Sequence, residues 1–137
     1  MKSPEGGMGS RSIHELLQTV CKKYTGHVAY RFKRQGSWLN VTWEEHRSAC
    51  KQIAKSLIAL GVQKGECVNI LSQTRLEWVQ CDFGINSSGG ITVGIYPTNL
   101  APDCAYVINH CEAHVIFVEN RDQLQKLFSS RDGLAAV

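Results

Sequence analysis

Three short apolar runs decide the fold of this chain: CVNIL at 67–71, ITVGI at 91–95 and VIFV at 115–118. Their length and their content of Val, Ile and Leu are typical of strands that are covered on both faces. A segment of helical character follows each run, over residues 75–88, 102–111 and 121–128. The alternation predicts successive βα units, which build a parallel sheet with helices on its faces.

Two further helices are predicted upstream of the first run, and each opens with a capping box. In this motif a Ser or Thr and a Glu three residues later accept hydrogen bonds from each other's backbone. The pairs are Ser12 with Glu15 and Thr42 with Glu45, and glycines end the helices near positions 26 and 61. Between the helices, extended runs at 28–32 and 38–41 flank Gln35 and Gly36, which predicts a β-hairpin.

Composition predicts one ordinary globular domain or part of one. The chain has 137 residues, of which 43% are hydrophobic and 20% charged, with three prolines. Its 15 Lys and Arg against 12 Asp and Glu give a net charge of +3. Because the basic residues form scattered pairs instead of a stripe with a reader motif, nucleic acid is not expected as a partner.

The cysteines and histidines do not have the spacing of a metal site or a disulfide framework. No C-x-x-C pair occurs among Cys21, Cys50, Cys67, Cys81, Cys104 and Cys111, so free thiols are predicted. The best candidate ligands are Cys104, His110, Cys111 and His114, but they fall on helix and strand positions instead of a zinc knuckle. No metal site is therefore predicted.

The sequence also predicts the character of the two chain ends and the cellular location of the protein. Residues 1–11 are rich in glycine and carry no apolar run of signal-peptide length, so we expect a flexible N-terminus. No stretch reaches the ~20 apolar residues of a membrane span, which predicts a cytoplasmic protein with reduced cysteines. Peripheral contact with a membrane is compatible with this prediction. Residues 134–137 resemble the approach to another strand, so the chain is expected to stop within a domain.

Several blocks carry a resemblance to a known family. They are VTWEE at 41–45, GECV at 65–68, GIYPTN at 94–99, YVINH at 106–110 and VIFVEN at 115–120. In order and spacing, these blocks resemble the N-terminal domain of the acyl-activating, adenylate-forming enzymes, and in particular the long-chain fatty acyl-CoA synthetases. The resemblance implies that residues 12–137 are part of an N-terminal AMP-binding domain, with an α/β fold.

The resemblance also implies a reaction for the whole protein. ATP and a fatty acid give an acyl-adenylate and pyrophosphate, and coenzyme A then displaces AMP; magnesium accompanies the ATP. The family carries its phosphate loop, ribose-binding acid and catalytic lysine downstream of this region. The chain is therefore expected to be an inactive N-terminal fragment of a ligase, without catalytic, cofactor-binding or metal-binding residues of its own. The alternative is a non-catalytic binding or assembly module with the same fold.

Some short motifs imitate functional sites. Ser87 to Gly90 looks like a phosphate loop but no lysine follows it, and the kinase-like triplet 82–84 lies within a predicted helix. None of the five histidines stands beside a nucleophile or an orienting acid in sequence; they are His14, His27, His46, His110 and His114.

The best candidates for a role near a ligand are Tyr96, Pro97, Thr98 and Asn99. They follow a predicted strand, and open α/β sheets bind ligands at the carboxyl ends of their strands. A role in shaping the loop is favoured over direct contact with a ligand.

Overall fold

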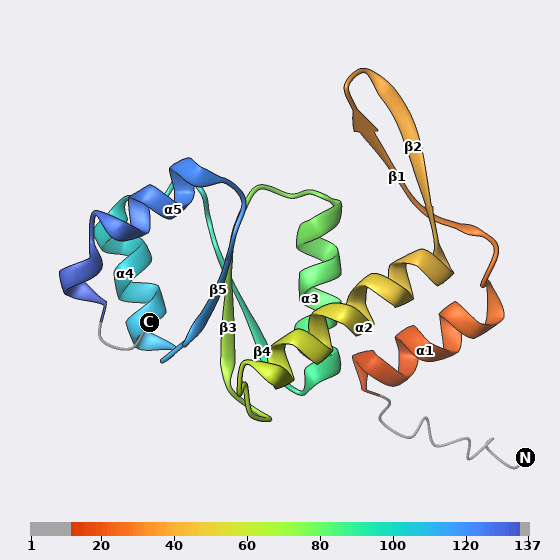
Figure 1. Ribbon diagram of the computed structural model, residues 1–137, viewed down its shortest axis with the longest axis horizontal. Coiled ribbons are helices and arrows are strands. Elements are labelled where there is room, and N and C mark those ends of the chain that lie inside the picture. The colour runs from red at the N-terminus through yellow and green to blue at the C-terminus, as the bar shows by residue number, and fades with distance from the viewer. Residues whose placement is uncertain (1–11, 135–137) are drawn as a thin grey trace, which may run out of the picture.

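The computed structural model of the chain describes residues 12–134, and it shows a parallel sheet between two layers of helices, with a hairpin set apart from them (Figure 1). The elements are α1 (Ile13–Lys23), β1 (Val28–Arg34), β2 (Ser37–Thr42), α2 (Trp43–Ala59), β3 (Cys67–Leu71), α3 (Leu76–Ser88), β4 (Ile91–Ile95), α4 (Ala101–His110), β5 (Val115–Val118) and α5 (Arg121–Phe128). The predicted α/β class and the predicted order of the elements are confirmed. No helix among the described residues has the length and apolar character to cross a membrane.

The expectations for the two ends fall largely outside the described residues. This holds for the flexible tail at 1–11 and for residues 135–137 of the expected strand approach. Leu134 itself follows a short 3₁₀ turn at Arg131–Gly133 and has an extended backbone. Three helix boundaries differ by one residue from prediction: Arg75 is the N-cap of α3, and α4 begins at Ala101 and ends at His110.

Both predicted capping boxes are formed. The Ser12 hydroxyl accepts a hydrogen bond from the Glu15 amide at 3.2 Å, and the Glu15 carboxylate accepts one from the Ser12 amide at 2.9 Å. At the start of α2 the corresponding distances between Thr42 and Glu45 are 3.2 and 2.7 Å. Each pair therefore satisfies two backbone donors that a helix N-terminus otherwise leaves without partners.

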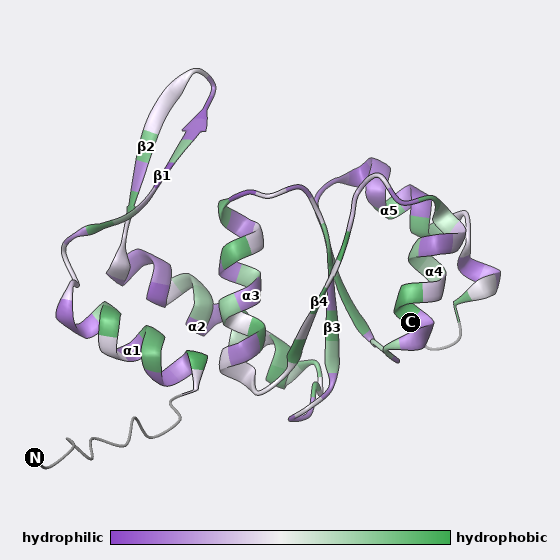
Figure 2. Cartoon of the chain, turned by 180° about the vertical axis from the view of Figure 1, so that it is seen from behind, coloured by the Kyte–Doolittle hydropathy of each residue, from purple (hydrophilic) through white to green (hydrophobic). Residues whose placement is uncertain are grey.

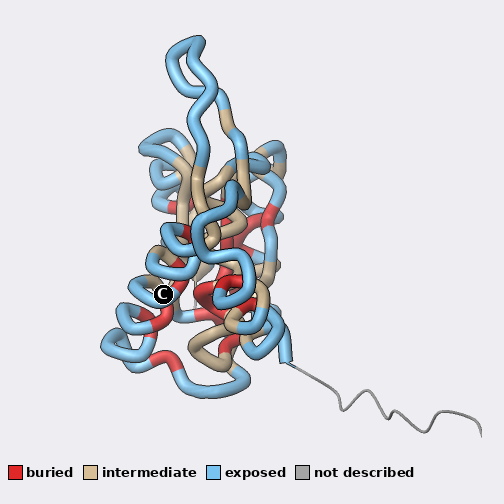
Figure 3. Tube along the Cα trace, turned by 90° about the vertical axis from the view of Figure 1, so that its right-hand side faces the viewer, coloured by how far each residue is buried: buried red, intermediate tan, exposed pale blue. Residues whose placement is uncertain are grey.

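The hairpin of β1 and β2 turns at Gln35 and Gly36, which both have positive φ, 50° and 81°. Positive φ at both central residues matches the twist of the flanking strands, which is why two-residue hairpin turns favour this geometry. The base of the hairpin is tied to the helices through the hydrogen bond from the Trp43 amide to the His27 carbonyl. The rest projects from the helices and is mostly exposed (Figure 3), although Arg34 near the turn reaches Glu77 at the start of α3.

The three parallel strands have the order β4-β3-β5. The chain passes from β3 through α3 to β4 on one side of β3, and then through α4 to β5 on its other side. Because crossovers are right-handed, this reversal of direction places α3 and α4 on opposite faces of the sheet. Figure 1 shows the result, with α2 and α3 on one side of the sheet and α4 and α5 on the other.

Alternate residues of β3 supply the cores on both faces. Val68 and Ile70 pack with Leu57 of α2 and Ile85 of α3, whereas Leu71 packs on the opposite face with residues of α4 and α5. All four residues from Val68 to Leu71 are no more than 1% exposed. The strands stand out as apolar segments in Figure 2, as the sequence predicted for a strand covered on both faces.

The helices α2 and α3 approach each other closely at Gly84. A Cβ atom on this residue would lie 2.5 Å from Cγ2 and 2.7 Å from Cβ of Ile53, and 3.3 Å from the carbonyl oxygen of Cys50. The triplet at 82–84 is therefore part of a packed helix, as its sequence context predicted. Glycine is required here because of the contact between helices and not because of its backbone conformation.

Substitution Gly84→Ala is expected to destabilise the chain by about 1–3 kcal/mol, although alanine has the better helix propensity by about 1 kcal/mol, because the new methyl group overlaps Ile53. Urea denaturation measures the change. Gly26→Ala is the control, since a Cβ there meets no atom within 4 Å, and it should stay within about 0.5 kcal/mol of the parent. Equal stability of the two variants would contradict the close packing of α2 on α3.

Candidate functional site at the carboxyl edge of the sheet

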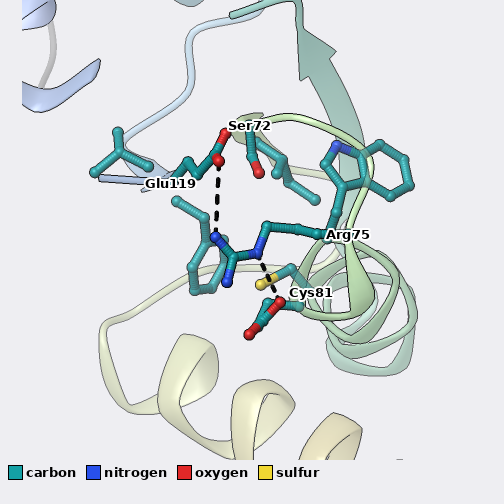
Figure 4. A pocket seen from close by; sticks show the side chains of 9 residues that line it. Ser72, Arg75, Cys81 and Glu119 are labelled. Atoms are coloured by element: carbon teal, nitrogen blue, oxygen red, sulfur yellow. Dashed lines mark hydrogen bonds and ion pairs between the residues drawn. The ribbon is translucent and has the colours of Figure 1, made fainter. Parts of the chain in front are cut away.

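A crevice lies at the carboxyl ends of β3 and β5, where the direction in which successive strands are added to the sheet reverses. After β3 the chain turns to α3 on one face of the sheet, and after β5 it turns to α5 on the other face, so the two connections diverge. Such a point is where open α/β sheets bind ligands. A hollow of about 250 Å³ lies here, with Ile70, Trp78, Cys81 and Phe117 in its apolar wall and Ser72, Arg75, Glu77 and Glu119 among its polar residues (Figure 4).

The charged groups of this crevice are paired with one another. The Nε atom of Arg75 donates to Glu77 at 2.6 Å, and its Nη1 atom lies 3.7 Å from Glu119. Glu77 also accepts a hydrogen bond from Arg34 of the hairpin at 3.0 Å, and Glu119 accepts one from the Gln73 amide at 2.8 Å. The Arg75 hydrogen bond is the main cause that lowers the pKa of Glu77 to about 2, so this carboxylate stays ionised at neutral pH.

A second hollow, of about 370 Å³, lies beside the first, toward β4. Residues from the β3–α3 connection, Ser72 to Thr74, line one part of it, and Gly94, Ile95, Tyr96 and Pro97 line another. Trp78 borders both hollows. The structure therefore brings two of the four predicted loop residues, Tyr96 and Pro97, to the same edge as the Arg75 network.

The loop after β4 is held in place by Lys126 of α5. The ammonium donates to the carbonyl oxygens of Pro97 at 2.6 Å and Asn99 at 2.9 Å. Within the loop, the Asn99 amide donates to the Tyr96 carbonyl at 3.0 Å. These contacts favour the predicted role in shaping the loop, while Tyr96 is 77% exposed and stays available to other partners.

The described residues at this edge do not fit a nucleotide with its magnesium ion. Arg75 already faces two carboxylates, and Lys126 donates to two backbone carbonyls. Glu77 occupies the first turn of α3, where an anion would otherwise be favoured by the helix dipole. Among residues 12–134, no group of three or more His, Cys, Asp or Glu side chains is arranged to hold a metal ion.

The segment Ser87 to Gly90 lies at the end of α3 and leads into the start of β4, at the opposite edge of the sheet. Gly89 ends the helix with a φ of 90°, and its carbonyl accepts a hydrogen bond from the Gly65 amide at 2.8 Å. The Ser87 hydroxyl lies 2.9 Å from Nδ1 of His14 and so links α3 to α1. This segment acts as a helix end and a tight turn, and its resemblance to a phosphate loop is superficial.

Of the five histidines in the sequence, His46 is the most deeply buried. It lies among the rings of Tyr30, Trp43 and Phe83, at centroid distances of 4.9 to 6.1 Å, and its burial lowers its pKa. Its Nε2 atom lies 3.6 Å from the sulfur of Cys50, but burial raises the pKa of this thiol to about 12, which opposes the thiolate form. The pair therefore has the properties of core packing and not of a reactive centre.

The other candidate ligands are dispersed. Cys104 is buried against α5 and the β4–α4 loop, and the Cys111 thiol donates to the side-chain oxygen of buried Asn69 at 3.6 Å. His110 stacks on Tyr106, with ring centroids 5.7 Å apart. All six cysteines are free thiols, in agreement with their spacing in the sequence.

Comparison with known proteins identifies the family of the chain. The sequence model of the AMP-binding enzyme family matches residues 17–136, which is most of the chain. The chain belongs to the AMP-binding enzyme family. This confirms the resemblance that the sequence blocks carry.

Relatives of this chain include long-chain-fatty-acid–CoA ligases. The long-chain-fatty-acid–CoA ligase ACSBG2 of Xenopus laevis is 39% identical over 123 residues, which are 90% of this chain and 17% of that protein. ACSBG2 of Homo sapiens is 36% identical over 86% of the chain and 18% of its own length. The chain thus spans about a sixth of the length of these relatives.

Solved structures give the same fold. The anthranilate CoA ligase AuaEII in complex with anthranoyl-AMP matches 93% of the chain and 24% of its own chain, with a TM-score of 0.81 and 26% identity. The N-terminal domain of FACL13 from Mycobacterium tuberculosis matches 89% of the chain and 30% of its own, with a TM-score of 0.80 and 19% identity. The fold of this chain is therefore that of the N-terminal region of adenylate-forming ligases.

The network of Arg75, Glu77 and Glu119 and the contact from Lys126 are not evident from the sequence. Arg75 and Glu119 are 44 positions apart, and Lys126 lies 27 positions from Asn99. A signal was nevertheless present, because Arg75 and Glu119 each follow a predicted strand, and the structure makes these two strands neighbours. Carboxyl ends of parallel strands meet at one edge of a sheet.

Replacement of Lys126 by Met tests whether this side chain holds the loop after β4 in place. Loss of the two charge-assisted hydrogen bonds is expected to destabilise the chain by about 1–3 kcal/mol, since the Pro97 and Asn99 carbonyls lose their donor. Chemical denaturation is the measurement, and Lys55→Met on the exposed surface of α2 is the matched control, with an expected change within about 0.5 kcal/mol. If the two variants prove equally stable, Lys126 does not hold the loop.

Proposed function

We propose that this chain is the N-terminal region of an AMP-forming long-chain fatty acid–CoA ligase. The observation that carries the proposal is the family match over residues 17–136 together with relatives that are long-chain-fatty-acid–CoA ligases and 30–39% identical along 85–90% of the chain. In the proposed reaction, ATP activates a fatty acid as its acyl-adenylate and the thiol of coenzyme A then displaces AMP.

The role of this chain in the proposed reaction is structural. The crevice at the carboxyl edge has Arg75, Glu77 and Glu119 engaged with one another, and it lacks a glycine-rich loop followed by lysine. Stabilisation of charge at the α-phosphate requires preorganised cations and donors aimed at the reacting oxygens. We therefore infer that other parts of the whole protein supply the groups that bind ATP, magnesium and coenzyme A, and that this chain provides no catalytic residue.

A reducing, cytoplasmic location is part of the proposal. It is supported by the six cysteines, which are all unpaired thiols, because free cysteines of this number are typical of proteins in a reducing compartment.

A second candidate function is a non-catalytic binding or assembly module. The projecting hairpin favours it, because a ribbon with exposed side chains on both strands is suited to contact with a partner. The two candidates differ in one respect: only the ligase requires a protein that carries a phosphate loop in addition to this region.

The test compares the 137-residue chain with the longest open reading frame that contains it, in an assay with palmitate, ATP, magnesium and coenzyme A. The longer protein is expected to form palmitoyl-CoA and AMP, while the chain alone yields no more product than a control without protein. Product from the chain alone would contradict the structural role proposed for it. A longer protein that folds, binds palmitate and yet forms neither adenylate nor thioester would favour the module.

A further inference from the structure

The net positive charge of the chain is concentrated in one segment. Between positions 16 and 43 there are five Lys and Arg residues and no Asp or Glu, so the remainder has ten basic residues against twelve acidic ones. Three of the five lie on the hairpin, as Arg31, Lys33 and Arg34, and the other two end α1. The projecting part of the molecule is therefore cationic, while the body has a small negative excess.

The pairing of β1 and β2 fixes which side chains share a face of the ribbon. Lys33 lies directly opposite Trp38, and Arg31 lies opposite Asn40. Directly opposed residues of an antiparallel pair point to the same face, and so do residues two apart on one strand. Arg31, Lys33 and Trp38 thus form one surface, named here the ribbon face.

The ribbon face is open to solvent. Trp38 is 68% exposed, Arg31 and Lys33 are exposed, and neither of the two basic residues forms an ion pair with another residue between 12 and 134. The opposite face carries Phe32, which is half-buried, and Leu39, which is 41% exposed. That opposite face is turned toward the start of α3, where Arg34 binds Glu77, so the ribbon face is the free face of the hairpin.

The ribbon is also held in a fixed position. The ring of Tyr30 contacts buried His46 at a centroid distance of 4.9 Å, and Arg34 near the turn forms its ion pair with Glu77 of α3. A protein pays less conformational entropy on binding when the contacting element is already ordered. The exposed indole is thus presented on a supported hairpin.

We propose that the ribbon face docks on an anionic lipid surface. Tryptophan is favoured at the boundary between headgroups and acyl chains, and basic residues next to it are attracted to anionic headgroups. The long side chains of Arg31 and Lys33 can keep their charges at the headgroups while Trp38 enters the boundary. Nucleic acid is a poorer fit, because the ribbon face has two basic residues beside one exposed indole, whereas a nucleic acid requires a broader basic track.

The proposal stands on the hairpin alone and does not depend on ligase activity. Its test uses the 137-residue chain and sedimentation with vesicles of phosphatidylcholine, with or without phosphatidylserine. Binding is expected only to the mixed vesicles, and it should weaken as salt is raised. In the double variant Arg31→Ser/Lys33→Ser, the partition coefficient onto the mixed vesicles is expected to fall roughly tenfold or more.

Two controls distinguish docking by the ribbon face from attraction by the overall charge of the chain and from nonspecific adhesion to vesicles. Lys51→Ser/Lys55→Ser removes the same charge from the exposed surface of α2 and should bind the mixed vesicles like the parent. Brominated lipids should quench the fluorescence of the parent, and this quenching should be lost in Trp38→Phe, which keeps the half-buried Trp43 and Trp78. Equal binding to both kinds of vesicle, equal losses in the two double variants, or binding to single-stranded DNA without binding to mixed vesicles would overturn the proposal.

Discussion

The pairing of β3 with strands on both of its edges is the constraint on which the rest of the structure depends. Because β4 and β5 flank β3 in parallel, each connection must cross a face of the sheet, and the reversal between them directs α3 and α4 to opposite faces. Both faces of β3 are then covered, which agrees with the complete burial of Val68 and Leu71. Even Asn69 is enclosed, and it donates to the Val93 carbonyl of β4 and accepts from the Cys111 thiol.

The same reversal creates the crevice, and the electrostatics of the crevice limit what this part of the protein can do. Arg75 joins the connection after β3 to the end of β5 through Glu119. Glu77 of α3 binds both Arg75 and Arg34, and so joins α3 to the hairpin. Exposed ion pairs of this kind contribute little stability individually, so their main effect is to fix how the elements meet. A charge network that is already satisfied leaves little capacity for a nucleotide, which is consistent with the supporting role proposed for this chain.

Interactions between residues close in sequence made most of the fold predictable. The capping boxes at Ser12 and Thr42 and the apolar runs depend on residues close in sequence, and they appear as expected. Gly84 and His46 could not be assigned in this way, because their roles depend on Ile53 and on three aromatic rings brought together by folding. At the candidate site, sequence placed Tyr96 to Asn99 at a strand end, whereas the Lys126 contact depends on how α5 packs.

The measurement that tests the central role of β3 most directly is native-state hydrogen exchange resolved by residue. Amides of buried central strands exchange only through the largest unfolding events, whereas exposed elements exchange through local opening. The slowest exchange is therefore predicted at Val68 to Leu71, with faster exchange in the projecting part of the hairpin. Protection in the hairpin that equals or exceeds that of β3 would contradict the view that the molecule is organised around this strand.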